Sequence, residues 1–443
     1  MSFRNMKYLL FLCATFMSVQ AFAEITIKNW THSSGAKVFL VETASIPMVD
    51  LQIDWGAGAV DVPVDKTGLA SLTAAMLDKG AMVHGKVLSE AEISDRLADQ
   101  GAVLSVMAGA DRTSLKLRSL SDRKYLSPVI DLAASVLSAP VFDAKILNRE
   151  KDLMISSIKE ANLKPEVVLG KEFDRQLYGS HPLSRSATVQ TVEKINISDV
   201  RDFYKKRFFA ANSKITIVGN LNHVDADAII DKLMKGLPVS SSQLKVVEPV
   251  KILSAKPLAD RVIKINHPSQ QAHISMGLPM ISRKDPDYFP LLLGNYILGG
   301  GGFVSRLMKE VREKRGLAYS VYSYVAPGKD IGPFVAGMQT KKEQSDLAVK
   351  VMTETITNFV TNGPTDEEIK SAKENLTNGF PLRIDSNKKI LDNVASIAWN
   401  ELPLDTLNTW TMQLNAVTKD QVIAAYKKHL DMNKMVTVVV GGQ

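Results

Sequence analysis

The chain contains an internal repeat that restricts its possible folds to a duplicated architecture. The stretch VRDFYKKRFFAANSKITIVG, which starts at Val200, is similar to VIAAYKKHLDMNKMVTVVVG, which starts at Val422. Five residues recur 222 positions later: Val200, Tyr204, Lys205, Lys206 and Gly219 return as Val422, Tyr426, Lys427, Lys428 and Gly441. Each copy predicts a helix followed by a β-branched strand that ends at glycine. The helical stretch from Asp143 to Glu160 has a counterpart from Asp366 onward at nearly the same offset, so we infer a duplication.

The duplication predicts two similar domains, residues 24–237 and 259–443, joined by a linker over residues 238–258. The linker, PVSSSQLKVVEPVKILSAKP, is rich in Ser, Pro and Lys and has little helical periodicity. Alternation predicts strands over 38–41, 49–55, 103–108 and 113–117, whereas amphipathic spacing predicts helices over 127–137 and 145–161. Long helices separated from runs of strands favour an α+β fold, in which each half is an antiparallel-rich sheet covered by helices.

The first 23 residues have the three-part pattern of a secretory signal peptide. Arg4 and Lys7 precede an apolar run from Tyr8 to Met17, and Ala21-Phe22-Ala23 places small residues where signal peptidase reads. The run is shorter than the about 20 residues of a membrane-spanning helix. We therefore expect cleavage after Ala23, export to the periplasm, and no membrane association of the mature protein. A short membrane-associated helix is the alternative, and the cell exterior is a second possible destination.

Composition excludes several classes of protein for the mature chain. Cys13 is the only cysteine and leaves with the signal, so neither a disulfide nor a thiolate metal site can form. The net charge of +7 includes Arg4 and Lys7, and the remaining +5 is small for 420 residues. Since basic and acidic residues are interspersed, we expect no nucleic-acid partner. Glycines 299–302 are not followed by the Lys-Ser/Thr of a phosphate-binding loop.

Three stretches resemble the pitrilysin/insulinase family of zinc peptidases, which includes the mitochondrial processing peptidases. They are residues 33–81, containing DWGAGAVDVPVDKTGLASLTAAMLDKGA, residues 177–208, containing LYGSHPLSRSATVQTVEKI, and residues 298–323, LGGGGFVSRLMKEVREKRGLAYSVYS. Their order, their spacing and the twofold repeat agree with that family over essentially the whole mature chain. The resemblance implies the family's duplicated fold.

The resemblance also implies that the zinc site is lost. Active members carry His-x-x-Glu-His on a helix, where two imidazoles one turn apart bind Zn²⁺ and the glutamate accepts a proton from the metal-bound water. The two histidine positions are Ser71 and Ala75 here, and the base position is Ala74. The third ligand, a glutamate seven residues after another acidic residue, is replaced by Ser157, seven residues after Glu150. Glu160 lies three residues further on, but one carboxylate does not make a zinc site.

No other zinc site is evident in the sequence. No two of the seven histidines are three or four residues apart, so we expect surface or partly buried imidazoles. We therefore expect this chain to bind no cofactor.

The third stretch carries a second family feature. Ser305 is expected to cap a helix that turns Leu307, Met308 and Val311 towards the core and ends at Gly316. A strand follows over 317–324, with Leu317, Tyr319 and Val321 expected on one face. The family has an arginine on this helix and a tyrosine seven residues later that reach the peptidase chamber. The matching residues are Arg312 and Tyr319.

The residues themselves leave the role of this stretch open. Arg312 is also compatible with a solvated helix face, and Tyr319 with a half-buried strand residue. We expect four glycines to lie in neither a helix nor a strand and to permit close backbone approach or loop movement: Gly299, Gly300, Gly301 and Gly302. In processing-peptidase relatives a glycine-rich loop of the non-catalytic subunit contacts substrate; the alternative is a flexible turn without a ligand.

Together these features predict a non-catalytic, substrate-binding subunit of a heterodimeric zinc metallopeptidase. A homologous partner with His-x-x-Glu-His would hold the zinc, and this chain would supply Arg312 and Tyr319, with no activity alone. Peptides are the expected substrates. One alternative is a retired peptidase that binds peptides or acts as a scaffold, as core subunits of a respiratory complex do. Another is an enzyme with an unrecognised mechanism, although no Ser-His-Asp spacing or carboxylate pair stands out.

Overall fold

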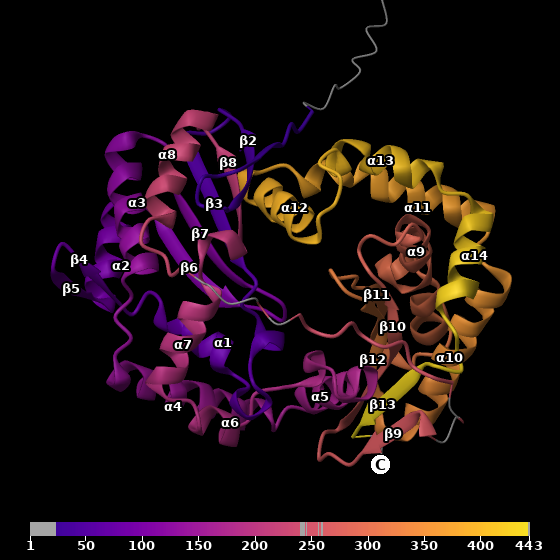
Figure 1. Ribbon diagram of the computed structural model, residues 1–443. Helices are drawn as coiled ribbons and strands as arrows, with labels where there is room; N and C mark the ends of the chain where they lie inside the picture. Colours follow the sequence, from indigo (N-terminus) through magenta and orange to yellow (C-terminus); the bar gives the residue numbers. More distant parts are fainter. Residues whose placement is uncertain (1–23, 240–243, 245, 256, 258–259, 442–443) are drawn as a thin grey trace, which may run out of the picture.

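Each half of the molecule is built around one twisted sheet (Figure 1). The computed structural model describes residues 24–239, 244, 246–255, 257 and 260–441. The predicted signal peptide and part of the predicted linker lie outside these residues. In the first half the strands are β1 (Lys28–Thr31), β2 (Lys37–Glu42), β3 (Met48–Trp55), β6 (Val103–Ala108), β7 (Thr113–Leu120) and β8 (Ser213–Gly219). In the second half they are β9 (Val262–Ile265), β10 (Gln271–Ile281), β11 (Ala318–Val325), β12 (Gly332–Lys341) and β13 (Val436–Val440).

The two sheets have the same topology, which confirms two similar halves. The first sheet has the order β1-β2-β8-β3-β7-β6 and the second β11-β12-β10-β13-β9. In each sheet one pair is parallel, β2 with β8 and β9 with β13, and the other pairs are antiparallel. Strand β1 extends the first sheet only. A separate hairpin joins β4 (Gly80–Val83) and β5 (Lys86–Ser89).

Two pairs of helices are separated by the same number of residues as the repeat in the sequence. In the first half they are α1 (Leu69–Met76), α2 (Glu90–Asp99), α3 (Arg123–Ser138), α4 (Ala144–Ala161), α5 (Pro165–Tyr178), α6 (Val189–Glu193), α7 (Ile197–Arg207) and α8 (His223–Met234). In the second half they are α9 (Tyr288–Asn295), α10 (Ser345–Asn362), α11 (Asp366–Asn378), α12 (Asn387–Asn400), α13 (Thr406–Ala416) and α14 (Lys419–His429). The pairs α5/α12 and α7/α14 are separated by 222 residues at both ends.

The residues that recur in the sequence make equivalent contacts in the two halves. Tyr204 and Tyr426 are both buried, and each donates its phenol hydrogen to a leucine carbonyl, of Leu137 and Leu291 respectively. A side chain at Gly219 would collide with the Met48 carbonyl, and one at Gly441 with the carbonyl of Gln271. Both glycines therefore recur because the neighbouring backbone approaches too closely for a Cβ atom.

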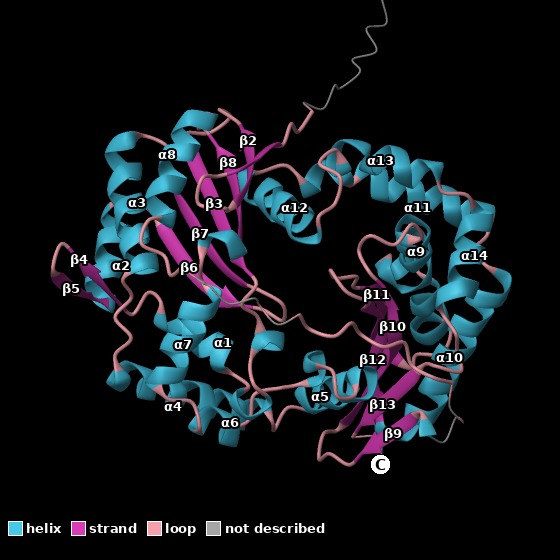
Figure 2. Cartoon of the chain, in the orientation of Figure 1, coloured by secondary structure: helices cyan, strands magenta, loops and turns pink. Residues whose placement is uncertain are grey.

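The halves exchange one helix each (Figure 2). Helix α5 packs on the sheet of the second half, where its residues Leu169, Phe173 and Leu177 meet Val436 and Val438. Helix α12 packs on β3 and β8 of the first half, and there Lys214 Nζ donates to the Ala398 carbonyl over 2.8 Å. This reciprocal packing joins the two halves through apolar burial as well as through the linker.

Helices of the described part of the chain are either too short or too polar to cross a membrane.

Candidate functional site

The degenerate metal position lies where helices α1 and α4 meet. Ser71 is exposed, Ala75 is half-buried and Ala74 is buried on α1, while Ser157 is exposed on α4. These four side chains offer hydroxyl and methyl groups in place of two imidazoles and two carboxylates. Leu72 and Met76 on α1 are fully buried in the core of the first half. Helix α1 has therefore kept its packing role without its metal ligands.

The carboxylates near the third ligand position are held by basic side chains. Arg149 binds Glu150 over 2.6 Å and Glu90 over 2.7 Å. Lys164 binds Glu160 over 2.8 Å, and this hydrogen bond lowers the pKa of Glu160. Both acidic residues that the sequence places around Ser157 are therefore engaged in ion pairs.

Asp285, Asp287 and His429 form the one described group of acidic and histidine side chains close enough to hold a metal ion. His429 Nε2 lies 2.8 Å and Lys428 Nζ 2.7 Å from the same oxygen of Asp287. Hydrogen bonds from Lys428 and then His429 lower the pKa of Asp287. Because an ammonium group already occupies that oxygen, we interpret the group as an ion-pair cluster between α9 and α14. His429 is accordingly a half-buried structural imidazole.

The predicted arginine lies on a helix of unusual winding. After one turn that begins at Arg306, residues Met308–Glu313 form a π-helix, in which Lys314 donates to the Lys309 carbonyl over 3.0 Å. Ser305 accepts a hydrogen bond from the Met308 amide at 3.5 Å, as its predicted capping role requires. Met308 and Val311 are buried and Gly316 has φ +61°, as predicted. The π-winding itself was not predicted, and such segments are frequent at functional sites.

Arg312 lies between two aromatic rings. Its guanidinium carbon is 4.9 Å from the ring centre of Phe303 and 4.8 Å from that of Tyr319. Within the described residues no carboxylate forms an ion pair with Arg312. The nearby carboxylate of Glu310 pairs instead with Lys314 and Arg315. Cation–π contacts orient the guanidinium but consume none of its N–H donors. The group is thus held in place with its hydrogen-bonding capacity free.

Tyr319 points to solvent, and the prediction that it shares a face with Leu317 and Val321 is wrong. Its side chain is 84% exposed, whereas Leu317 and Val321 are buried. The pairing of β11 with β12 shifts register between Ala318 and Val321. This irregularity breaks the simple alternation and turns the ring of Tyr319 out of the core and towards Arg312.

The glycine run does not behave as predicted throughout. Gly299 and Gly300 belong to a second π-helical segment, Tyr296–Gly300, so the expectation that none of the four is helical is wrong. The expected close approach occurs at Gly299, where a Cβ atom would lie 2.5 Å from the Ser323 amide nitrogen. Gly301 closes the segment by donating to the Tyr296 carbonyl over 2.8 Å, and Gly302 has φ +60°.

These elements line an open pocket of about 450 Å³. It is lined by three of the four glycines, Gly299, Gly300 and Gly302, and by Phe303, Arg312 and Tyr319. Tyr322 and Tyr324 also line it and stack on each other, with ring centres 6.1 Å apart. Phe303 and these two tyrosines were missed in the sequence, although YSVYSYV shows aromatic residues at alternate positions of a strand. The pocket therefore presents the guanidinium of Arg312, which has no ion-pair partner among the described residues, beside aromatic rings.

Comparisons with known proteins agree with this geometry. Residues 37–190 match the model of the insulinase family, peptidase family M16, and residues 194–376 match the M16 inactive domain. A crystal structure of a peptidase M16 inactive domain from Pseudomonas fluorescens is 34% identical, with a TM-score of 0.88, and covers 95% of this chain and 98% of that one. The chain belongs to the M16 peptidase family. Since all positions of the family's zinc site are replaced, it is a peptidase-like, non-catalytic M16 member.

Two further relatives show the range of this M16 family. The "non-peptidase homolog YmxG" of Helicobacter pylori is 24% identical over 98% of this chain and 97% of its own length. The periplasmic protease PqqL of Escherichia coli is 17% identical with a TM-score of 0.78, and the alignment covers 95% of this chain but 47% of PqqL. The M16 fold of this chain thus corresponds to about half of the PqqL chain.

Proposed function

We propose that this chain is the substrate-binding, non-catalytic subunit of a heterodimeric zinc metallopeptidase that degrades or processes peptides. The observation that carries the proposal is the free guanidinium of Arg312, held between Phe303 and the exposed Tyr319. In the part of the chain that the structure describes, Arg312 pairs with no carboxylate, since Glu310 is taken by Lys314 and Arg315. Its arrangement is suited to a group that arrives from outside the chain.

The chemistry of the pair is transition-state support. A guanidinium fork donates to substrate carbonyl groups, and a phenol hydrogen can be donated to the oxyanion that forms when a peptide carbonyl is attacked. The attacking water and its zinc ion would be held by a homologous partner with His-x-x-Glu-His, because Ser71, Ala74, Ala75 and Ser157 cannot hold them. The coverage of PqqL supports this pairing, since a single-chain protease of the fold is about twice as long. The periplasmic location of PqqL also supports export of this chain.

Capture of the native partner tests the proposal. The chain is tagged at its C-terminus, expressed in its own cell, and purified with whatever binds it. We expect a homologous chain with His-x-x-Glu-His at equal stoichiometry, and cleavage of a fluorogenic peptide by the complex that neither purified chain performs alone. Purification of the chain as a monomer or homodimer, under conditions that preserve its fold, contradicts the proposal.

The name of the Helicobacter pylori relative favours a second candidate, a peptide-binding or scaffold protein without a role in turnover. The variants Arg312→Ala and Tyr319→Phe separate the two. Both should reduce cleavage by the complex if this chain supports the transition state. Under the scaffold alternative they leave cleavage unchanged.

A further inference from the structure

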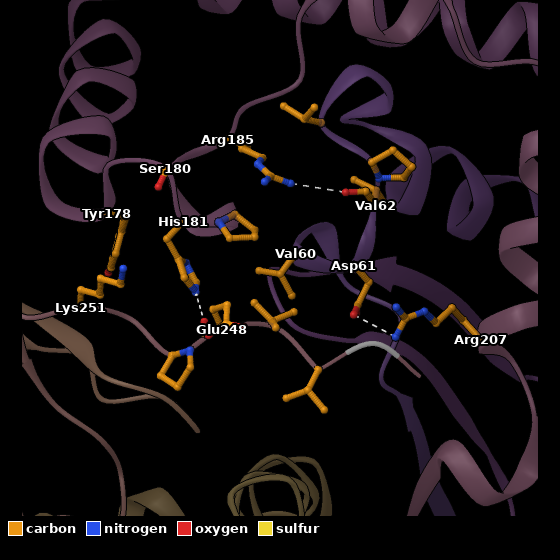
Figure 3. A pocket seen from close by; sticks show the side chains of 16 residues that line it. Val60, Asp61, Val62, Tyr178, Ser180, His181, Arg185, Arg207, Glu248 and Lys251 are labelled. Carbon is orange, nitrogen blue, oxygen red and sulfur yellow. Dashed lines mark hydrogen bonds and ion pairs between the residues drawn. The ribbon is translucent and has the colours of Figure 1, made fainter. Parts of the chain in front are cut away.

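A second cavity, of about 690 Å³, lies between the end of α5, the loop before α1 and the linker (Figure 3). Its walls include apolar side chains from three separate segments, Val60 and Val62, Pro182, and Val246. Arg185 also lines it, and Figure 3 shows the guanidinium of Arg185 directed across the space towards Val62. The cavity thus combines an apolar lining with three basic residues, Arg185, Arg207 and Lys251, and two acidic ones, Asp61 and Glu248.

Arg185 differs from Arg207, the other arginine of this cavity, because its guanidinium is nearly uncommitted. The one hydrogen bond that it makes with a described residue is long, 3.5 Å from Nη1 to the Val62 carbonyl. Arg207, in contrast, binds Asp61 over 2.9 Å and the Gly56 carbonyl over 3.2 Å. Arg185 therefore retains most of its five N–H donors for a ligand.

The imidazole of His181 is committed to the linker. Its Nδ1 accepts a hydrogen bond from the Leu183 amide at 3.1 Å, so its Nε2 donates, to the Glu248 carbonyl at 2.8 Å. Val250 in the same segment is buried, and its amide donates to Asp330 over 2.7 Å. The linker wall of the cavity is thus fixed to both halves of the molecule.

The second half carries no arginine at the corresponding sequence position. At the offset of 222 residues Arg185 corresponds to Leu407, although Arg185 follows a short 3-10 turn and Leu407 lies within α13. Leu407 is buried and packs in the apolar core of that half. A half-buried arginine that pairs with no carboxylate of the described residues loses hydration and gains no ion pair from them, so its presence points to a ligand.

We infer that this cavity binds the carboxylate that ends a peptide, with Arg185 as its partner and the last side chain against the valines. The inference rests on the proposed peptide-binding function and specifies its substrates as peptides anchored by their C-terminus. A planar guanidinium suits a carboxylate because two parallel N–H groups can reach both oxygens. The apolar walls favour an aliphatic or aromatic terminal residue.

Binding of paired peptides to the full mature chain tests the inference. A fluorescent unstructured peptide that ends in leucine is compared as the free acid and as the C-terminal amide, by anisotropy. We expect the amide to bind about tenfold more weakly, because it loses a charge-assisted hydrogen bond. Arg185→Gln should weaken binding of the free acid to the level of the amide. Arg201→Gln is the matched control, since Arg201 also makes one hydrogen bond to a backbone carbonyl, that of Phe142, but lies outside the cavity.

The outcomes separate this inference from the proposed function. Equal binding of acid and amide overturns the inference while the peptide-binding function stands. If the native chain binds neither peptide, while circular dichroism shows that it and Arg185→Gln are folded, both the inference and the peptide-binding function are overturned. An amide that ends in aspartate tests a second source of the carboxylate. Binding of that peptide like the free acid, with loss on Arg185→Gln, supports a carboxylate site and shows that a side chain can supply the group.

Discussion

Helix α1 in the first half and the segment from Gly299 to Tyr319 in the second half differ in what their side chains offer. Helix α1 has lost every polar group that its family uses for chemistry, yet Leu72 and Met76 still fill the core. The other segment keeps Arg312, which forms no described ion pair, and Tyr319, which is exposed. The first region therefore contributes packing, while the second presents an arginine and a tyrosine in cation–π contact with each other. The proposed function rests on these two side chains.

The largest expected effect tests the structural role of α1. Leu72→Ala should lower the free energy of unfolding by about 2–5 kcal/mol, because it leaves a cavity in a fully buried site. Ser71→Ala, one residue away and exposed, should change it by less than about 0.5 kcal/mol. Urea denaturation followed by circular dichroism measures both. Equal costs for the two variants would show that α1 is not a packing element.

The second prediction concerns the segment from Gly299 to Tyr319. Arg312→Gln should lower the kcat/KM of the reconstituted peptidase pair about 100-fold, or about 2.7 kcal/mol, if its N–H groups support the transition state. The melting temperature should remain unchanged, since the side chain makes no ion pair in the described structure. Arg315→Gln is the control, because Arg315 lies nearby and pairs with Glu310. A similar loss of activity in both variants would indicate a general charge effect.

The third prediction concerns α5, which belongs to the first half and packs on the sheet of the second half. Burial raises the pKa of Asp174 from 3.8 to about 6. The folded chain therefore binds a proton that the unfolded chain has released, and the free energy of unfolding falls as pH rises through this window.

Asp174→Asn should consequently stabilise the protein by roughly 2 kcal/mol near neutral pH, after allowance for solvent screening, and by much less at about pH 4. Thermal denaturation at both values measures the effect. Asp202→Asn on the exposed face of α7 is the control. The same change in both variants would exclude burial of Asp174 as the cause.

The smallest expected effect concerns the glycine run. Gly302 has φ +60°, and a Cβ atom placed there would meet no neighbouring atom. Gly302→Ala should therefore lower the free energy of unfolding by about 1 kcal/mol through backbone strain alone. Gly302→Asn should cost less, since asparagine tolerates the left-handed region. Unfolding curves of the two variants give the comparison. A larger cost for asparagine would point to crowding instead of strain.

The repeat in the sequence predicted much of the fold, because duplicated residues such as Tyr204 and Tyr426 occupy equivalent buried sites. Strands such as Val103–Ala108 and the long helix over 145–161 follow local periodicity, and the structure confirms them within one residue. The exchange of α5 and α12 could not be predicted, since an apolar helix face does not specify which sheet it covers.

The site was harder to predict than the fold. The pairing of Arg312 with Tyr319 came from family resemblance, while its aromatic setting depends on Phe303 and on a register shift in β11. Both are consequences of tertiary packing, and neither leaves a local signal. The predicted signal peptide lies outside the described residues and stays a prediction.

Zinc content and peptide cleavage of the purified mature chain test the central claim most directly. Mass spectrometry under native conditions should detect far less than one zinc ion per chain, and a fluorogenic peptide should remain uncleaved until a His-x-x-Glu-His partner is added. One tightly bound zinc ion per chain, together with cleavage that Ser71→Ala or Ser157→Ala abolishes, would contradict the account.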